Sequence, residues 1–112
     1  MHALFKEMTG FSRHRSEYLD DSQFAKLQQF LLQQPEGGPV IEGTGGLRKL
    51  RWCDPERNKG KRGGIRIVYY WYERRSQFWL FAIYGKDEMD DLTTAQKALL
   101  KMALQAEVKI RG

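Results

Sequence analysis

Three runs of strand-forming residues follow one another between residues 45 and 85, and no other feature constrains the fold of this chain as strongly. Residues 65–72 are β-branched or aromatic apart from Arg66, which is typical of a strand covered on both faces. Residues 78–84 are continuously apolar and end at Gly85-Lys86, where the glycine lets the chain turn. The three runs predict a small sheet. Arg66 is the one charged residue in the second run, so its presence there requires an explanation.

The run at residues 47–52 places cations on one defined face of this sheet. Side chains along a strand alternate between its two faces, so Lys49 and Arg51 share one face. Arg48, Leu50 and Trp52 share the other face. We therefore expect two cations side by side on one side of the sheet.

Two helices are expected before the sheet. Thr9 or Gly10 can open a short first helix, and Asp20 or Asp21 can cap a second one. Gln23 stands three residues after Asp20, which is the spacing of a capping box. In the second helix, apolar residues recur at spacings of three and four, the pattern of a helix laid on a sheet: Phe24, Leu27 and Leu31.

A final helix is predicted to run to about Val108, and Thr93 and Gln96 have capping-box spacing at its start. Its apolar stripe is expected on one side, formed by Leu99, Met102, Ala103 and Ala106. Residues 3–8 predict a short strand at the edge of the sheet or next to it. The expected class is α+β: a small, mainly antiparallel sheet with two N-terminal helices and one C-terminal helix packed on it.

Length and composition exclude several classes of protein. A chain of 112 residues fits one domain, residues 1–112, with one core. No apolar run approaches the roughly 20 residues that cross a bilayer. The N-terminus lacks the apolar core of a signal peptide, and the lone Cys53 cannot form an internal disulfide, so we expect a cytoplasmic location. Residues 87–91 contain four acids, which the helix dipole favours just ahead of a helix N-terminus. Both histidines are distant in the sequence, so we prefer this interpretation to a metal site.

The positive charge is concentrated. Residues 48–66 hold eight of the 19 Lys and Arg residues and two of the 14 acids, for a local net charge of +6 in a chain of +5. A field confined to one patch attracts a polyanion, and nucleic acid is the commonest such partner. A solvated basic face kept for solubility is the alternative interpretation.

Lysine and arginine are the residues that remain for catalysis. No Ser or Cys stands in a recognisable setting with a positioned His, and the sheet lacks paired carboxylates. Several cations on one face can hold a phosphodiester and neutralise the charge that builds up in its transition state. RNA carries its own nucleophile, the 2′-hydroxyl, so its cleavage requires no metal and no cofactor.

Three segments carry a resemblance to a known family over essentially the whole chain: GTGGLRKLR (residues 43–51), GKRGGIRIVYY (residues 60–70) and IYGKDEMDDL (residues 83–92). In this order and spacing, the chain resembles the RelE/HigB-like toxins of bacterial type II toxin-antitoxin modules, closest to the HigB branch. The resemblance implies helices packed on a small antiparallel sheet and cleavage of messenger RNA in the ribosomal A site.

The resemblance also implies the site. Its catalytic cations fall on Lys49, Arg51, Arg66 and Lys86, with Arg66 stabilising the phosphate and Lys49 or Arg51 in base and charge roles. Further RNA contacts are expected from Arg48, Lys59, Lys61, Arg62 and Tyr84, the last by stacking on a base. The implied partners are the ribosome, its mRNA and a co-encoded antitoxin, usually with a helix-turn-helix domain, in a hetero-oligomer.

The chain departs from the archetype in two places. Asp87 stands where some members have an arginine, and no tyrosine follows Tyr84, so the acid role and the base-stacking role have no assigned residue. Tyr84 can fill the stacking role, or it can belong to the core. Two other functions therefore stay open: an RNA-binding or ribosome-binding protein without catalysis, and a protein-interaction module whose basic face accepts an acidic partner.

Overall fold

The computed structural model describes residues 2–52, 64–86, 88 and 91–111. Strands and helices follow one another in the order β1 (Leu4–Glu7), α1 (Thr9–Tyr18), α2 (Asp21–Gln33), β2 (Arg48–Trp52), β3 (Ile65–Tyr72), the short 3₁₀ helix η2 (Glu73–Arg75), β4 (Gln77–Gly85) and α3 (Thr94–Arg111). The three strands predicted between residues 45 and 85 are confirmed, with ends that differ by at most one residue.

The described strands form one mixed sheet in the order β1-β4-β3-β2. β2 and β3, and β3 and β4, pair antiparallel, whereas β1 pairs parallel to β4 at one edge. The α+β class, the three helices and the mainly antiparallel sheet are thus confirmed. β3 lies between two neighbours and is buried along most of its length, as its uniform β-branched and aromatic composition predicts.

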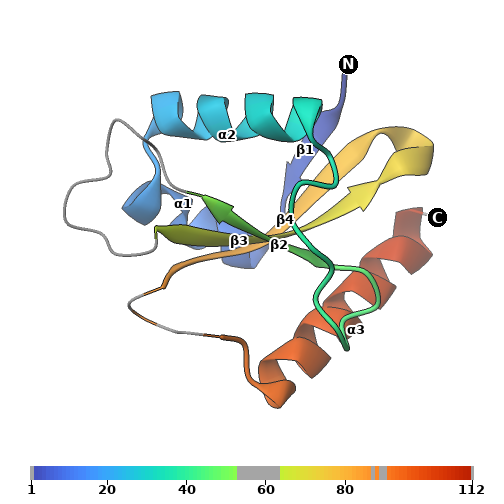
Figure 1. The fold of residues 1–112 in the computed structure, drawn as a ribbon. Helices are drawn as coiled ribbons and strands as arrows, with labels where there is room; N and C mark the ends of the chain where they lie inside the picture. Colours follow the sequence, from blue (N-terminus) through green and yellow to red (C-terminus); the bar gives the residue numbers. More distant parts are fainter. Residues whose placement is uncertain (1, 53–63, 87, 89–90, 112) are drawn as a thin grey trace.

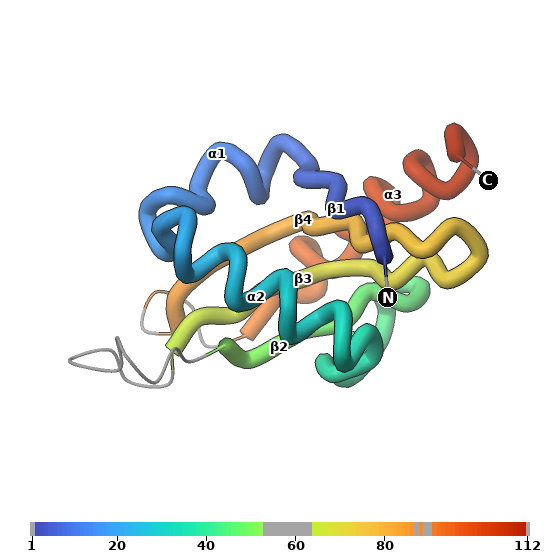
Figure 2. The backbone as a smooth tube through the Cα atoms, turned by 90° about the horizontal axis from the view of Figure 1, so that it is seen from above, coloured from blue at the N-terminus to red at the C-terminus, as the bar shows by residue number. Residues whose placement is uncertain are grey.

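The helices cover the sheet from both sides (Figure 1). α1 and α2 pack on one face, which we call the α2 face, and α3 packs on the other, the α3 face (Figure 2). Each face has its own apolar cluster. The α2 face joins Phe11, Leu27 and Leu31 to Ile67 and other strand residues, and the α3 face joins Leu104 and Leu92 to residues such as Val68 and Trp79.

Capping boxes begin α2 and α3, as predicted. Asp20 Oδ1 accepts from the Gln23 backbone N–H at 2.8 Å, and Gln23 Oε1 accepts from the Asp20 N–H at 2.9 Å. The Thr93 N–H donates to Gln96 Oε1 at 2.8 Å, and the Gln96 N–H donates to Thr93 Oγ1 at 3.1 Å. Both boxes satisfy helix N–H groups that have no partner within the helix.

The predicted packing face of α3 is wrong. Leu99 and Met102 are 66% and 64% exposed, and Ala103 and Ala106 are exposed as well. The helix instead packs through Leu104, which is 3% exposed, with Leu100 and Val108 beside it. Apolar residues occur on more than one side of α3, so their spacing alone does not select the side that meets the sheet. The helix also continues to Arg111, beyond the predicted end.

Candidate functional site

Three polar side chains form a row across the α3 face. Strand pairing sets Arg51 of β2 opposite Arg66 of β3, and Arg66 opposite Tyr84 of β4. Directly opposed residues of paired strands point to the same face of the sheet. Lys49, two residues before Arg51, therefore points to this face too. The structure brings Lys49, Arg51 and Arg66 together on one face, which the sequence could establish only for the first two.

Arg66 is the buried member of this row. It is 4% exposed, and its Nη1 donates to the carbonyl of Ile65 at 3.5 Å. Arg51, directly opposite, is exposed. Two positive charges directly opposite one another on paired strands suit an anion bound between them.

Lys49 and Asp91 form an ion pair at the mouth of an open pocket. Lys49 Nζ lies 3.3 Å from Asp91 Oδ1, which also accepts the Leu92 backbone N–H at 2.9 Å. The hydrogen bond from Leu92 and the Lys49 ammonium hold the pKa of the Asp91 carboxyl below its usual range. The pocket has a volume of about 700 Å³, within the range of ligand sites. The charged side chains that line it are both positive and negative: Glu42, Lys49, Arg51, Asp91 and Lys97.

The segment that follows α2 builds one wall of this pocket. Gly38 approaches β2 so closely that a Cβ there would lie 2.7 Å from the carbonyl oxygen of Lys49. Further on, Thr44 is fully buried, and its hydroxyl donates to the carbonyl of Ile41 and accepts from the N–H of Leu47. The adjacent Gly43 has φ of +83°, which favours glycine. The GTGG segment thus acts as a tight turn that delivers β2, and with it Lys49, to the pocket.

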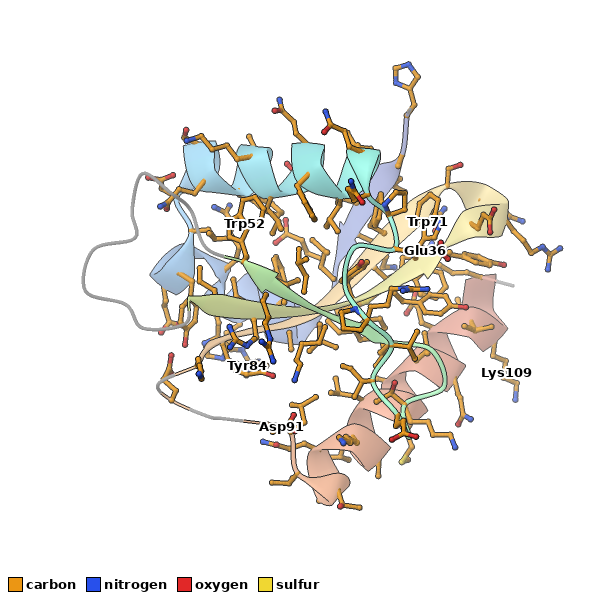
Figure 3. All side chains as sticks on the ribbon, in the orientation of Figure 1. Glu36, Trp52, Trp71, Tyr84, Asp91 and Lys109 are labelled. Atoms are coloured by element: carbon orange, nitrogen blue, oxygen red, sulfur yellow. The ribbon has the colours of Figure 1, made fainter. Side chains whose placement is uncertain are left out.

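Tyr84 ends the row with a buried hydroxyl. The residue is 7% exposed, and its Oη has no hydrogen-bond partner among the described residues. Burial raises the pKa of the Tyr84 phenol, the negative charge of Asp91 adds to the rise, and the positive charge of Arg66 opposes it. Figure 3 shows Tyr84 on the α3 side of the sheet, with Asp91 below it on the segment that leads into α3. A ring this buried offers little surface for stacking on a base.

The other predicted site residues lie outside the row of Arg51, Arg66 and Tyr84. Lys86 is exposed directly after β4, where its backbone N–H donates to the carbonyl of Gly64 at 3.3 Å. It therefore lies at the sheet end nearest the Arg51–Arg66–Tyr84 row. Arg48 points to the α2 face and is tied to the loop after α2 by Glu36 Oε2 at 3.3 Å and the Gly38 carbonyl at 2.9 Å. Lys59, Lys61 and Arg62 lie outside the described residues.

Sequence reasoning missed Asp91 and Lys97. Asp91 belongs to an acidic run that the helix dipole already explains, and Lys97 resembles any charged residue near the start of a helix. Their meeting with Lys49 depends on how α3 docks, and no spacing in the sequence encodes that. The described residues contain no group of three or more His, Cys, Asp or Glu side chains suited to holding a metal ion. Within the same residues, every helix is too short or too polar to cross a bilayer.

Comparison with known proteins identifies the fold. No protein-family model matches the sequence. Among solved structures, a mutant of the E. coli toxin RelE in the free state superposes with a TM-score of 0.55 at 14% identity, covering 88% of this chain and 96% of that one. RelE in the intact E. coli RelBE toxin-antitoxin complex matches with a TM-score of 0.51 at 14% identity, covering 75% of this chain and 96% of that chain. The chain has a RelE-like fold.

Proposed function

We propose that this protein is the toxin of a type II toxin-antitoxin module and acts as a ribosome-dependent endoribonuclease that cleaves mRNA in the ribosomal A site. The RelE-like fold supports the toxin assignment, and the polar row on the α3 face supports the nuclease assignment. The three sequence segments that resemble the HigB branch support an assignment to that branch within the proposal. We further infer one toxin domain, residues 1–112, that works in the cytoplasm.

The observation that carries the nuclease proposal is the pairing of Arg51 with Arg66 across β2 and β3. One guanidinium is buried and the other is exposed on the same face. A phosphate bound on this face would be held by both guanidinium groups. Lys49, two residues along β2, adds a third positive charge to the same face.

The reaction is attack by the RNA 2′-hydroxyl on the neighbouring phosphorus. The bond from phosphorus to the 5′-oxygen breaks, which leaves a 2′,3′-cyclic phosphate and a 5′-hydroxyl. Arg66 and Arg51 stabilise the negative charge that builds on the phosphoryl oxygens. Arginine does not readily release a proton, so Arg51 and Arg66 act by charge alone, Lys49 adds its ammonium charge beside them, and the 2′-hydroxyl proton passes to solvent water. Lys86 and the Tyr84 hydroxyl, at the β4 end of the row, are the donors for the departing 5′-oxygen.

A partner that neutralises the toxin is part of the proposal. The RelBE complex among the similar structures supports a co-encoded antitoxin, which we expect to carry a helix-turn-helix DNA-binding domain and to form a hetero-oligomer with this chain. The neighbouring reading frame tests this directly. Co-expression of its product should restore growth and copurify with the toxin.

Primer extension on a defined mRNA in a reconstituted translation system tests the nuclease. The wild-type protein should produce new 5′ ends within codons, and Arg66→Gln should lower their yield by about 100-fold or more, since it removes a transition-state charge contact. Arg48→Gln is the matched control because it removes the same charge from the neighbouring strand on the α2 face. It should retain most of the cleavage.

Circular dichroism of Arg66→Gln must show the native fold, and Arg66→Lys, which keeps the charge, provides a second folded variant with partial activity. Wild-type cleavage by a folded Arg66→Gln protein would refute the proposed site.

Binding without catalysis is the second candidate, favoured by Asp87 in place of an arginine and by the lack of a tyrosine after Tyr84. It predicts that the wild-type protein inhibits translation and yields no new 5′ ends. A basic protein-interaction module predicts neither effect.

A further inference from the structure

The pocket beside the arginine pair is larger than one phosphate needs, and the cations that line it or lie next to it fall into two groups. Arg51 and Arg66 form one group, in register across β2 and β3. Lys49 and Lys97 form the other, since both line the pocket around Asp91. Lys49 and Arg51 stand two residues apart on one strand, a separation of roughly 6.6 Å. This is comparable to the distance between neighbouring phosphates of an RNA strand.

We propose that Lys49 and Lys97 form a second phosphate-binding subsite, which takes the backbone phosphate next to the scissile one, and that the Asp91 carboxylate occupies this subsite in the free protein. The proposal rests on the proposed function, because it assumes a single-stranded RNA in the pocket. It adds Lys97 to the site, and it assigns the Asp91 carboxylate the position that a phosphate takes when RNA is bound.

The contacts of Asp91 support this role. Its Oδ1 lies 3.3 Å from Lys49 Nζ, as a phosphate oxygen would lie on an ammonium. The second cation acts on it as well: after the Leu92 N–H and Lys49, the charge of Lys97 also helps to lower the pKa of Asp91. An anionic oxygen thus already rests on Lys49, in a pocket that Lys97 also lines.

The same contacts make the carboxylate easy to displace. The Asp91 side chain is 65% exposed, and its contacts within the described residues are Lys49 and the N–H of the next residue. Exposed ion pairs contribute little to stability, so rotation of one side chain frees the lysines at small cost. A phosphodiester approaching along β2 can then replace the carboxylate.

Lys97 is positioned for the subsite by the start of α3. Its backbone N–H donates to the Thr93 carbonyl at 2.9 Å in the first helical turn, directly after the Thr93–Gln96 capping box. The side chain is partly buried at the pocket, whereas Lys101, one turn further on, is exposed and does not line it. The two lysines therefore form a natural pair of test and control.

Fluorescence anisotropy with a labelled single-stranded 2′-O-methyl oligoribonucleotide tests the subsite without cleavage, because the blocked 2′-oxygen cannot attack. Asp91→Asn should tighten binding about three- to fivefold, since the competing carboxylate is gone. Glu42→Gln removes the same charge from another pocket carboxylate that pairs with no cation among the described residues. It should change the dissociation constant by less than about twofold.

Lys97→Gln should weaken binding about three- to fivefold, and Lys101→Gln by less than about twofold. One lost phosphate contact on a single strand also lowers the slope of log affinity against log salt by about 0.7, and Lys97→Gln should show this change while Lys101→Gln should not.

Equal effects of Asp91→Asn and Glu42→Gln would overturn the proposal, and so would equal effects of Lys97→Gln and Lys101→Gln. Failure of the wild-type protein to bind the oligonucleotide at low salt would overturn it as well. The nuclease has a separate readout in primer extension. A protein that cuts no mRNA and yet gives the four expected affinities retains the subsite and loses only the nuclease.

Discussion

Two buried tyrosines, one on each face of the sheet, have hydroxyls in different environments. Tyr69, on the α2 face, accepts the Gly38 N–H at 3.1 Å and donates to the Pro35 carbonyl at 2.9 Å, so its buried hydroxyl is fully engaged. Tyr84, on the α3 face, buries a hydroxyl that has no partner among the described residues.

The charged residues follow the same division. On the α2 face, Arg48 is neutralised by Glu36 and by backbone carbonyls. On the α3 face, Arg66 is buried opposite Arg51, and Lys49 pairs with the exposed carboxylate of Asp91. The α2 face satisfies the hydroxyl of Tyr69 and the guanidinium of Arg48, while Trp52 Nε1 on that face is buried without a hydrogen-bond partner among the described residues. The α3 face gathers Lys49, Arg51 and Arg66 on one side of the sheet, an arrangement suited to binding an anion.

The largest expected effect separates two leucines that the sequence treats alike. Leu27 of α2 is fully buried on the α2 face, and Leu99 of α3 is 66% exposed. Leu27→Ala should lower the free energy of unfolding by about 2–5 kcal/mol, because it leaves a cavity in a packed core. Leu99→Ala should change it by less than about 0.5 kcal/mol. Urea denaturation measures both, and similar losses for the two variants would contradict the observed orientation of α3.

The same substitution at the two tyrosines should have opposite signs. Tyr69→Phe should lower the free energy of unfolding by about 1–3 kcal/mol, because the Gly38 N–H and the Pro35 carbonyl lose their hydrogen-bond partner. Tyr84→Phe removes a buried hydroxyl without a partner, so it should leave stability unchanged or raise it by up to about 1 kcal/mol. It should nevertheless reduce mRNA cleavage. Urea denaturation and mRNA cleavage are measured on the same preparations of both variants. A loss of stability in Tyr84→Phe would contradict the predicted difference between the two tyrosines.

The smallest effect is a difference in alkaline stability. Burial raises the pKa of both Tyr69 and Tyr84, so the folded protein holds these phenol protons more tightly than the unfolded chain does. Their contribution is complete below the unfolded pKa of about 10 and is lost as pH rises through the folded-state values. Tyr84→Phe should therefore lose less stability than the wild type between about pH 9 and pH 11. Denaturation curves at both pH values measure this, and parallel losses would refute it.

Local patterns predicted the elements of this fold well because their causes are local. Aromatic and β-branched residues define β3, and the Asp20–Gln23 and Thr93–Gln96 spacings place the starts of α2 and α3. Period-two alternation also assigned Lys49 and Arg51 to one face and Arg48 to the other. These features depend on residues close in sequence, where side-chain direction follows directly from backbone geometry.

The candidate site was only partly predictable. The sequence proposed Lys49, Arg51 and Arg66, and a pattern within one strand could align only the first two. Strand register aligned Arg66 and Tyr84 with Arg51, and the docking of α3 added Asp91 and Lys97. The same docking overturned the apolar stripe expected through Leu99 and Met102, since α3 carries apolar residues on more than one side.

The sequence by itself determined that this chain forms a small sheet with helices and concentrates its positive charge beside the β2 strand. Only the tertiary structure decided which side of α3 meets the sheet, which arginine is buried, and which carboxylate rests on Lys49. Each of these depends on contacts between residues distant in the chain, such as Lys49 with Asp91 and Arg51 with Arg66. Such contacts are selected by the packing of whole elements against one another, which short-range periodicity does not encode.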